Sequence, residues 1–280
     1  MIKIFCLTSG RTGTKYLSYL FKNNIENCIS KHEPPPNMFG KSIYWYQNGD
    51  KDKIKELFKI KLEKINNYNV NLYVETNHSF LKSFSDVAIE FFPDMKLVHA
   101  IRDPLKVAKS NFNRYEQLRK IRYPLNYRGD DGKKYIKWTL TGNEEIYKFL
   151  NFNNKTIYQI SDEDKIYQYF ILEWIETEKR AIDFLNKYNK HNDCYILDVP
   201  KDLNNAKKVK DMFNFFNLKM KRREITFKGN KNKGKKKTIV TEHEKNLFNE
   251  TISKLPKSYL KIFKDKPYVD FKWGNIFSKY

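Results

Sequence analysis

The stretch Ser9-Gly10-Arg11-Thr12-Gly13-Thr14-Lys15 lies between an apolar run that begins at Ile2 and an amphipathic run that begins at Tyr16. An apolar run, a turn with glycine and an amphipathic run, in that order, predict a strand, a tight turn and the start of a helix. Backbone N–H groups at such a helix start, left accessible by glycine, form a ready site for phosphate or a similar oxyanion. The sequence therefore predicts that the first turn of the chain binds an anion.

A nucleotide-hydrolysing phosphate loop differs from this stretch at two positions. That loop, G-x-x-x-x-G-K-[ST], requires glycine before the lysine and a hydroxyl after it to hold magnesium. Here Thr14 precedes Lys15 and Tyr16 follows it, so the metal-ligating hydroxyl is missing from its usual place. The stretch fits a phosphate loop that works without magnesium better.

A second strand-to-helix stretch lies near the middle of the chain. The apolar run 96–101 is followed by Arg102-Asp103-Pro104, and Ser110 comes 8 residues after the arginine. Asp103 and Pro104 suit the cap and first turn of a helix, and ligands of open α/β sheets bind at the carboxyl ends of strands. Arginine offers planar donors to a phosphate, and a hydroxyl in the early turns of the helix can reach the same group. We therefore predict that Arg102 and Ser110 bind a second phosphate.

Together the two motifs resemble those of the sulfotransferases that use 3′-phosphoadenosine 5′-phosphosulfate (PAPS). S-G-R-T-G-T is similar to the family's 5′-phosphosulfate loop, and R-D-P with the later serine is similar to its 3′-phosphate motif. The resemblance implies a P-loop NTPase-like sulfotransferase fold, an α/β three-layer sandwich with a central parallel sheet of about five strands. It implies PAPS as the cofactor, 3′-phosphoadenosine 5′-phosphate as its product, and no metal. The cofactor-binding residues that it implies are Gly10, Arg11, Thr12, Gly13, Thr14, Lys15, Arg102 and Ser110.

The chain departs from the commoner P-K-S-G-T-T pattern of this family at two positions. Arg11 stands in place of the lysine, and Lys15 occupies a threonine position. By resemblance, Arg11 would balance the charge that develops on the leaving phosphate oxygen. Lys15 would then contact the sulfate or the acceptor directly. Both residues are candidates for the catalytic machinery.

The segment Lys31-His32-Glu33-Pro34-Pro35-Pro36 follows a short predicted strand and should lie at the same edge of the sheet. Related sulfotransferases place a glutamate at this point, often as H-E-P, and use it as a general base. A carboxylate within hydrogen-bond reach can take the acceptor's proton, and the prolines can fix its direction. Glu33 is our first choice for the base and His32 the alternative. A solvated His-Glu pair before a rigid turn is the plain structural interpretation.

Asn77 and His78 follow another predicted strand and should project into the same cleft. They are candidates for binding the acceptor or assisting catalysis, although a histidine at a strand end often only makes a structural hydrogen bond. Trp174 resembles a helical aromatic residue of the family, but a tryptophan buried in the core is the simpler interpretation.

Alternation of strands and helices predicts a parallel sheet covered on both faces. At 280 residues the chain suits a single domain, 1–280. Residues 121–156 break the alternation and are interpreted as an insertion that helps enclose the acceptor. The predicted strands are 2–8, 28–31, 72–76, 96–101 and 194–199, and the predicted helices are 14–24, one within 51–66, 80–92, 105–119, about 162–190 and 203–216.

The net charge of +21 is spread along the whole chain, and only residues 219–237 form a concentrated patch, with 10 Lys or Arg against one acidic residue. By resemblance, this segment is a basic loop that covers the cofactor, with Lys233 and Gly234 as candidate contacts beside Lys231 and Lys235. A positive cleft would raise the encounter rate with an acidic nucleotide and an acidic acceptor.

The 3 cysteines are widely spaced and form no zinc-binding pattern, which favours reduced thiols in a cytoplasmic compartment. No apolar run approaches the ~20 residues that span a membrane, and the first predicted strand leaves no room for a signal sequence.

The resemblance implies a PAPS-dependent sulfotransferase that transfers a sulfuryl group in line to a hydroxyl or amine, with a glycan or glycolipid as the favoured acceptor. Tyrosyl peptides and small alcohols remain open as acceptors. Two other interpretations are kept. A P-loop nucleotide or small-molecule kinase would need magnesium and ATP. A basic nucleic-acid-binding protein with a degenerate phosphate loop would need its Lys231–Lys237 patch for binding, whereas Arg11 and Arg102 would be dispensable.

Overall fold

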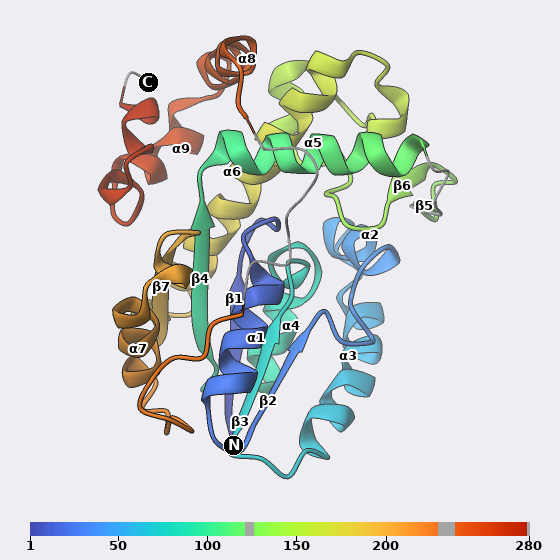
Figure 1. Cartoon of the computed structure of the whole chain (residues 1–280). Helices are drawn as coiled ribbons and strands as arrows, with labels where there is room; N and C mark the ends of the chain where they lie inside the picture. Colours follow the sequence, from blue (N-terminus) through green and yellow to red (C-terminus); the bar gives the residue numbers. More distant parts are fainter. Residues whose placement is uncertain (121–125, 229–238, 279–280) are drawn as a thin grey trace.

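A computed structural model describes residues 1–120, 126–228 and 239–278. Its centre is a sheet of five parallel strands in the order β2-β3-β1-β4-β7, with helices on both faces (Figure 1). The predicted three-layer α/β architecture is therefore confirmed. The strands are β1 (Ile2–Leu7), β2 (Cys28–His32), β3 (Leu72–Thr76), β4 (Lys96–Arg102) and β7 (Cys194–Val199).

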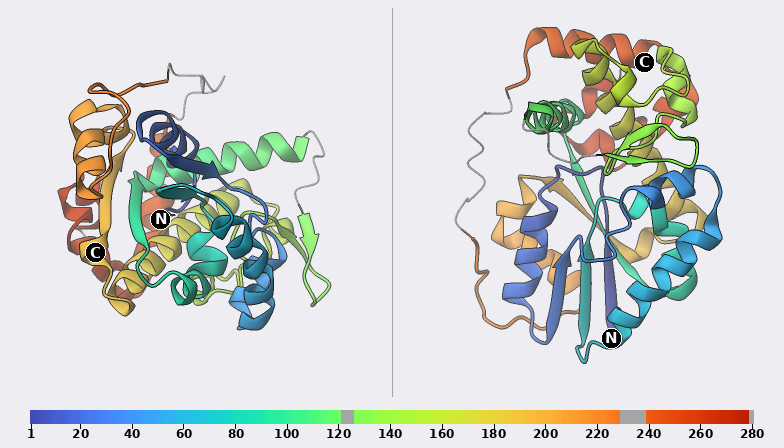
Figure 2. Two further views of the ribbon diagram at one scale, coloured as in Figure 1. Left: turned by 90° about the horizontal axis from the view of Figure 1, so that it is seen from below. Right: turned by 90° about the vertical axis from the view of Figure 1, so that its right-hand side faces the viewer.

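Successive side chains of β1 enter two separate hydrophobic clusters. Ile4 and Cys6 face α1 (Thr14–Asn24) and α7 (Ala206–Phe215), whereas Phe5 and Leu7 face the opposite layer. Figure 2 shows α1 and α7 on one side of the sheet and α3 on the other. Because both faces are covered, the strand is apolar and buried from Ile4 to Leu7 instead of alternating. The opposite layer consists of α3 (Lys51–Asn66), the π-helical turn η1 (Phe80–Phe84), α4 (Ser85–Phe91) and the C-terminal half of α6 (Glu163–Lys187).

A third cluster lies beyond the carboxyl edge of the sheet, where α5 (Pro104–Lys120) crosses above the strands (Figure 1). Trp174 of α6 is buried there, with its ring stacked 5.2 Å from that of Phe263, which confirms its interpretation as a core residue. The other parts of this cluster are the hairpin β5 (Asn126–Arg128) and β6 (Lys134–Ile136), the 3-10 turns η2 (Glu145–Leu150) and η3 (Ile157–Gln159), α8 (Glu242–Ser253), α9 (Lys257–Leu260), and the turns η6 (Lys261–Lys264), η7 (Tyr268–Asp270) and η8 (Gly274–Phe277).

The structure differs from the predicted elements at the starts of two helices and at elements that the prediction missed. The helix predicted over 80–92 begins as the π-helical turn η1, in which Lys82 turns inward to a buried carboxylate on α6. The helix predicted over 203–216 begins later, because Asn205 caps α7 after the 3-10 turn η5 (Asp202–Asn204). The sequence prediction missed α2 (Lys41–Gln47), whose apolar residues follow no helical period. It also missed the hairpin β5–β6, the turn η4 (His191–Asp193) and the helices α8 and α9.

Cys6, Cys28 and Cys194 are free thiols, as predicted, and burial raises the pKa of each. Within the described ranges, no helix combines the length and the apolar character needed to cross a membrane.

Helix α3 provides a matched test of the packing. Phe58 is fully buried against η1 and α4, whereas Ile60 on the same helix is 48% exposed. We predict that Phe58→Ala lowers the free energy of unfolding by about 3–5 kcal/mol, because it leaves a cavity. Ile60→Ala should change it by less than about 0.5 kcal/mol. Urea denaturation measures both; equal effects would contradict the packing described.

Candidate active site

The loop between β1 and α1 has the backbone shape of an anion-binding turn. Gly10, Arg11 and Gly13 have positive φ angles of 90°, 56° and 78°. A Cβ atom on Gly13 would also come within 3.1 Å of Leu203, so both the backbone angle and the space favour glycine. Thr8 Oγ1 accepts from the Gly10 amide at 3.2 Å and shares a hydrogen bond with Thr12 Oγ1. The loop is therefore held by its own hydroxyl groups.

The start of α1 is available to a ligand. Its N-cap residue is Gly13, which has no side chain to cap the first amides, although the Tyr16 amide bonds the Gly13 carbonyl. Thr12 and Thr14 are buried, whereas Arg11, Gly13 and Lys15 are exposed. The positive end of the helix dipole and two cationic side chains thus meet on one exposed surface.

The two predicted phosphate-binding motifs meet in space. Arg11 Nε donates to Ser110 Oγ at 2.9 Å, and Arg102 Nη1 donates to the Arg11 carbonyl at 2.6 Å. Asp103 caps α5 by accepting from the amides of Leu105 and Lys106, as predicted. The capped helix directs Ser110 toward the loop that follows β1. The structure therefore joins the candidates of both motifs in one site.

Positive charge is concentrated at this junction. Although Arg11 is exposed by surface area, partial desolvation of its guanidinium by the surrounding atoms lowers its pKa, and the charges of Arg114 and Arg102 lower it further. Burial likewise lowers the pKa of Arg102. Guanidinium groups gathered in this way favour a ligand with several negative charges. Arg114 was not among the predicted residues; its position one turn after Ser110 on the same helix, at i+4, was the available signal.

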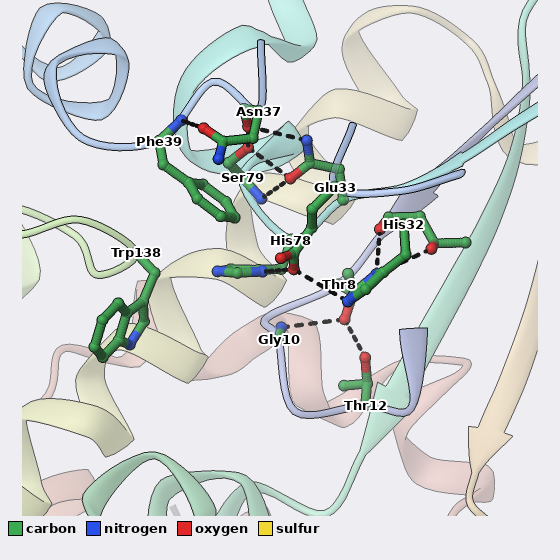
Figure 3. Close-up of polar contacts among 12 residues, drawn as sticks. Thr8, Gly10, Thr12, His32, Glu33, Asn37, Phe39, His78, Ser79 and Trp138 are labelled. Carbon is green, nitrogen blue, oxygen red and sulfur yellow. Dashed lines mark hydrogen bonds and ion pairs between the residues drawn. The ribbon is translucent and has the colours of Figure 1, made fainter. Parts of the chain in front are cut away.

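A histidine–carboxylate pair lies beside the loop (Figure 3). His78 Nδ1 donates to Glu33 Oε1 at 2.7 Å. His32 Nδ1 donates to the Thr76 carbonyl at 2.9 Å, and its Nε2 lies 3.6 Å from the same Glu33 oxygen. Two predicted candidates, His32 and His78, thus lie at the carboxylate oxygen Oε1 of a third, Glu33.

The protonation states of this pair leave one nitrogen free. Burial acts to raise the pKa of Glu33, but the hydrogen bond from His78 and the positive charges around it lower the pKa overall. Burial lowers the pKa of His78, and Glu33 only partly opposes this effect. Near neutral pH the pair is therefore a carboxylate and a neutral imidazole. Since Nδ1 carries the proton given to Glu33, Nε2 of His78 has a free lone pair.

His78 lies directly against the anion-binding loop. A Cβ atom on Gly10 would be 3.5 Å from the His78 ring, so the two are in contact. Phe39 covers part of the ring, with centroids 4.8 Å apart. Figure 3 shows the imidazole extending away from Glu33 toward Trp138. The free nitrogen therefore faces an aromatic surface next to the loop.

The segment that carries Glu33 is fixed mainly by side chains that bond its carbonyl groups. Glu33 itself has a φ of 51°, which is unusual for a residue other than glycine. Four carbonyl groups within residues 34–38 accept hydrogen bonds from side chains of α3, of η1 and of the turn after β3. These carbonyls belong to Pro34 (from Lys61), Pro35 (from Lys64), Asn37 (from Asn77 and Ser79) and Met38 (from Ser83).

Asn77 is 1% exposed, and its amide is used within the protein. Its Nδ2 donates to Glu75 and to the Asn37 carbonyl, and its Oδ1 accepts from Ser79. In this structure Asn77 positions the segment of Glu33; its contact with the acceptor stays a prediction.

The basic segment 219–237 is described only as far as Lys228. The backbone amide and carbonyl of Thr226 both form hydrogen bonds with the side chain of Asn24. Lys228 Nζ lies 5.3 Å from the centre of the Tyr19 ring. This part of the segment therefore runs beside α1 from its C-terminal end toward its middle. The candidates Lys231, Lys233, Gly234 and Lys235 lie outside the described residues.

The pKa of His78 provides a direct test of the pair. We predict that its imidazole titrates below the usual value of about 6.5, and that Glu33→Gln lowers this pKa further, because the negative charge that raises it is removed. NMR titration of ¹⁵N-labelled histidine measures the pKa. Glu26→Gln, a carboxylate paired with Lys219 on the surface, is the control and should leave it unchanged. A rise of the pKa in Glu33→Gln would contradict the assigned pairing.

No protein-family model matches the chain, and no curated protein matches its sequence. Eighteen chains of solved structures match its fold. One is the crystal structure of a sulfotransferase from Alicyclobacillus acidocaldarius, which is 14% identical with a TM-score of 0.48; the alignment covers 92% of this chain and 96% of that chain. This likeness concerns the arrangement of strands and helices alone. Within the described ranges, no three His, Cys, Asp or Glu side chains gather as a metal site.

Proposed function

We propose that the protein is a PAPS-dependent sulfotransferase that transfers a sulfuryl group to a hydroxyl or amine of its acceptor. One observation carries this proposal: the loop Gly10–Lys15 meets Arg102 and Ser110 on one side and the His78–Glu33 pair on the other. A site for two phosphate groups thus adjoins a general base.

The residues at the junction suit a nucleotide with phosphates at both ends of its ribose. The amides of Gly10–Lys15 would hold the 5′-phosphosulfate, in the manner of a helix N-terminus. Arg102 and Ser110 would hold the 3′-phosphate, with Arg114 as a further cation. When bound, PAPS supplies the sulfuryl group and departs as 3′-phosphoadenosine 5′-phosphate.

The free nitrogen of His78 is placed to take the proton of the acceptor. Nε2 would accept this proton as the acceptor takes the sulfuryl group that bound PAPS would supply, with 3′-phosphoadenosine 5′-phosphate as the leaving group. The loop amides and Arg11 would stabilise the negative charge that develops on its 5′-phosphate oxygen. Glu33, the first choice for the base from the sequence, is here a positioning residue that fixes the His78 tautomer, because its Oε1 accepts from Nδ1.

The surface beside His78 supports an acceptor with a flat apolar face. Phe39 packs on the His78 ring, and the Lys82 ammonium fixes the Trp138 carbonyl at 3.0 Å. Aromatic rings of this kind pack well on flat ligands such as sugar rings. A glycan or glycolipid acceptor therefore remains the favoured proposal.

Nucleotide binding tests the proposal first. We predict that 3′-phosphoadenosine 5′-phosphate binds without magnesium and more tightly than ATP. Arg102→Ala should weaken this binding about 10- to 100-fold, because a charged hydrogen bond contributes about 1.5–3 kcal/mol. Isothermal titration calorimetry measures both.

Arg119→Ala is the matched control for Arg102→Ala. Arg119 lies at the far end of α5, paired with Glu116, and its loss should leave binding unchanged. Magnesium-dependent preference for ATP would favour the kinase. Binding of RNA or DNA that survives Arg102→Ala would favour the nucleic-acid-binding alternative.

Kinetics tests the roles of His78 and Glu33. We predict that His78→Asn lowers kcat for sulfuryl transfer about 10²- to 10⁴-fold, because the base is lost. Nucleotide affinity should be unchanged. Glu33→Gln should retain measurable activity, with the acid limb of its pH profile moved to lower pH, following the lowered pKa of His78. An acid limb that stays in place in Glu33→Gln would contradict His78 as the base.

A further inference from the structure

The residues next in sequence to Glu33 and His78 bond the same buried ion pair. Lys61 Nζ donates to both oxygens of Glu75, at 2.8 and 3.0 Å. The same ammonium donates to the carbonyl of Pro34, beside Glu33, at 3.3 Å. Glu75 Oε1 accepts from Asn77 Nδ2, beside His78, at 2.9 Å. One ion pair therefore contacts both segments that carry the His78–Glu33 pair.

The ion pair is buried and well supplied with hydrogen bonds. The side chains of Lys61 and Glu75 are 2% and 0% exposed. The Tyr73 hydroxyl also donates to Glu75 Oε2 at 2.7 Å. Each charge thus has partners that offset the cost of removing it from water.

Burial of this pair is weak support for stability alone. Replacing a buried ion pair by uncharged groups of similar size is often neutral, so the charges point to a geometric role. Lys61 belongs to α3 and Glu75 to β3, two elements whose packing is otherwise apolar. Besides the bond from Tyr73, the hydrogen bonds of the pair run to Pro34 and Asn77, which adjoin Glu33 and His78 in sequence.

We infer that Lys61 and Glu75 are positioning residues, which hold Glu33 against His78 through Pro34 and Asn77. This inference rests on the proposed function for its kinetic consequence. Its structural consequence, the hydrogen bond between His78 and Glu33, is independent of the reaction. The positive φ of Glu33 requires such support, because this backbone conformation is otherwise disfavoured.

The test replaces both charges at once. The double variant Lys61→Met with Glu75→Gln removes the ion pair and the hydrogen bond to Pro34. The amide side chain introduced at position 75 can still form hydrogen bonds with Tyr73 and Asn77. We predict a cooperative unfolding transition and an affinity for 3′-phosphoadenosine 5′-phosphate within twofold of wild type. In ¹⁵N spectra, His78 should lose the single tautomer protonated at Nδ1. The kcat for sulfuryl transfer should fall about 10²-fold, as expected for small misplacement of a catalytic group.

Lys55→Met is the matched control, since Lys55 also lies on α3 and forms an ion pair with Glu90 at 2.8 Å, and its described partners lie outside the Glu33 segment. Its tautomer signal and kcat should stay near wild type. If the double variant fails to fold, Asn77→Ala tests the same connection with the ion pair intact, and should also disturb the tautomer. A folded double variant with an unchanged His78 signal would overturn the inference. If the His78 signal changes in the double variant but the wild-type protein shows no sulfuryl transfer, the proposed function would be overturned and the inference about positioning would stand.

Discussion

Parallel pairing of β1 with both β3 and β4 is the constraint on which the rest of the site depends. The register places Leu7 beside His99, and it aligns the end of β3 with the end of β2 at Thr76 and His32. All the strands therefore direct their following loops to one edge of the sheet. The loop after β1, the His78 turn, the Glu33 segment and Arg102 meet there because each follows or ends a parallel strand of this sheet.

Charge at this edge is divided between two kinds of environment. Toward solvent, three arginines come together: Arg11, Arg102 and Arg114. Among the described residues, none of their hydrogen-bond partners is a carboxylate. Toward the interior, lysines are neutralised by buried carboxylates, as in the pairs Lys61–Glu75 and Lys82–Glu173. The first arrangement suits a ligand that brings negative charge, whereas the second stabilises the geometry of neighbouring segments.

The cluster beyond the sheet edge links the segment of Arg102 to the segment of Trp138. Trp174 Nε1 donates to the Arg102 carbonyl at 3.2 Å, and Lys82 joins η1 to α6 and to Trp138. Residues 126–156, which interrupt the strand and helix alternation, thus contact the same long helix that supports the cationic residues. These contacts explain why a segment without a regular pattern has a defined place in the structure.

The sequence alone predicted the five strands, most of the helices and the two anion-binding motifs, because periodicity, glycine positions and helix caps depend on near neighbours in the chain. It also predicted Glu33, His32 and His78 as candidates without showing which of them is free to accept a proton. Only the tertiary structure paired His78 with Glu33 across 45 residues, Arg11 with Ser110 across 99, and Lys61 with Glu75 across 14. These pairings depend on how layers pack and which charges become buried, and no local pattern records either.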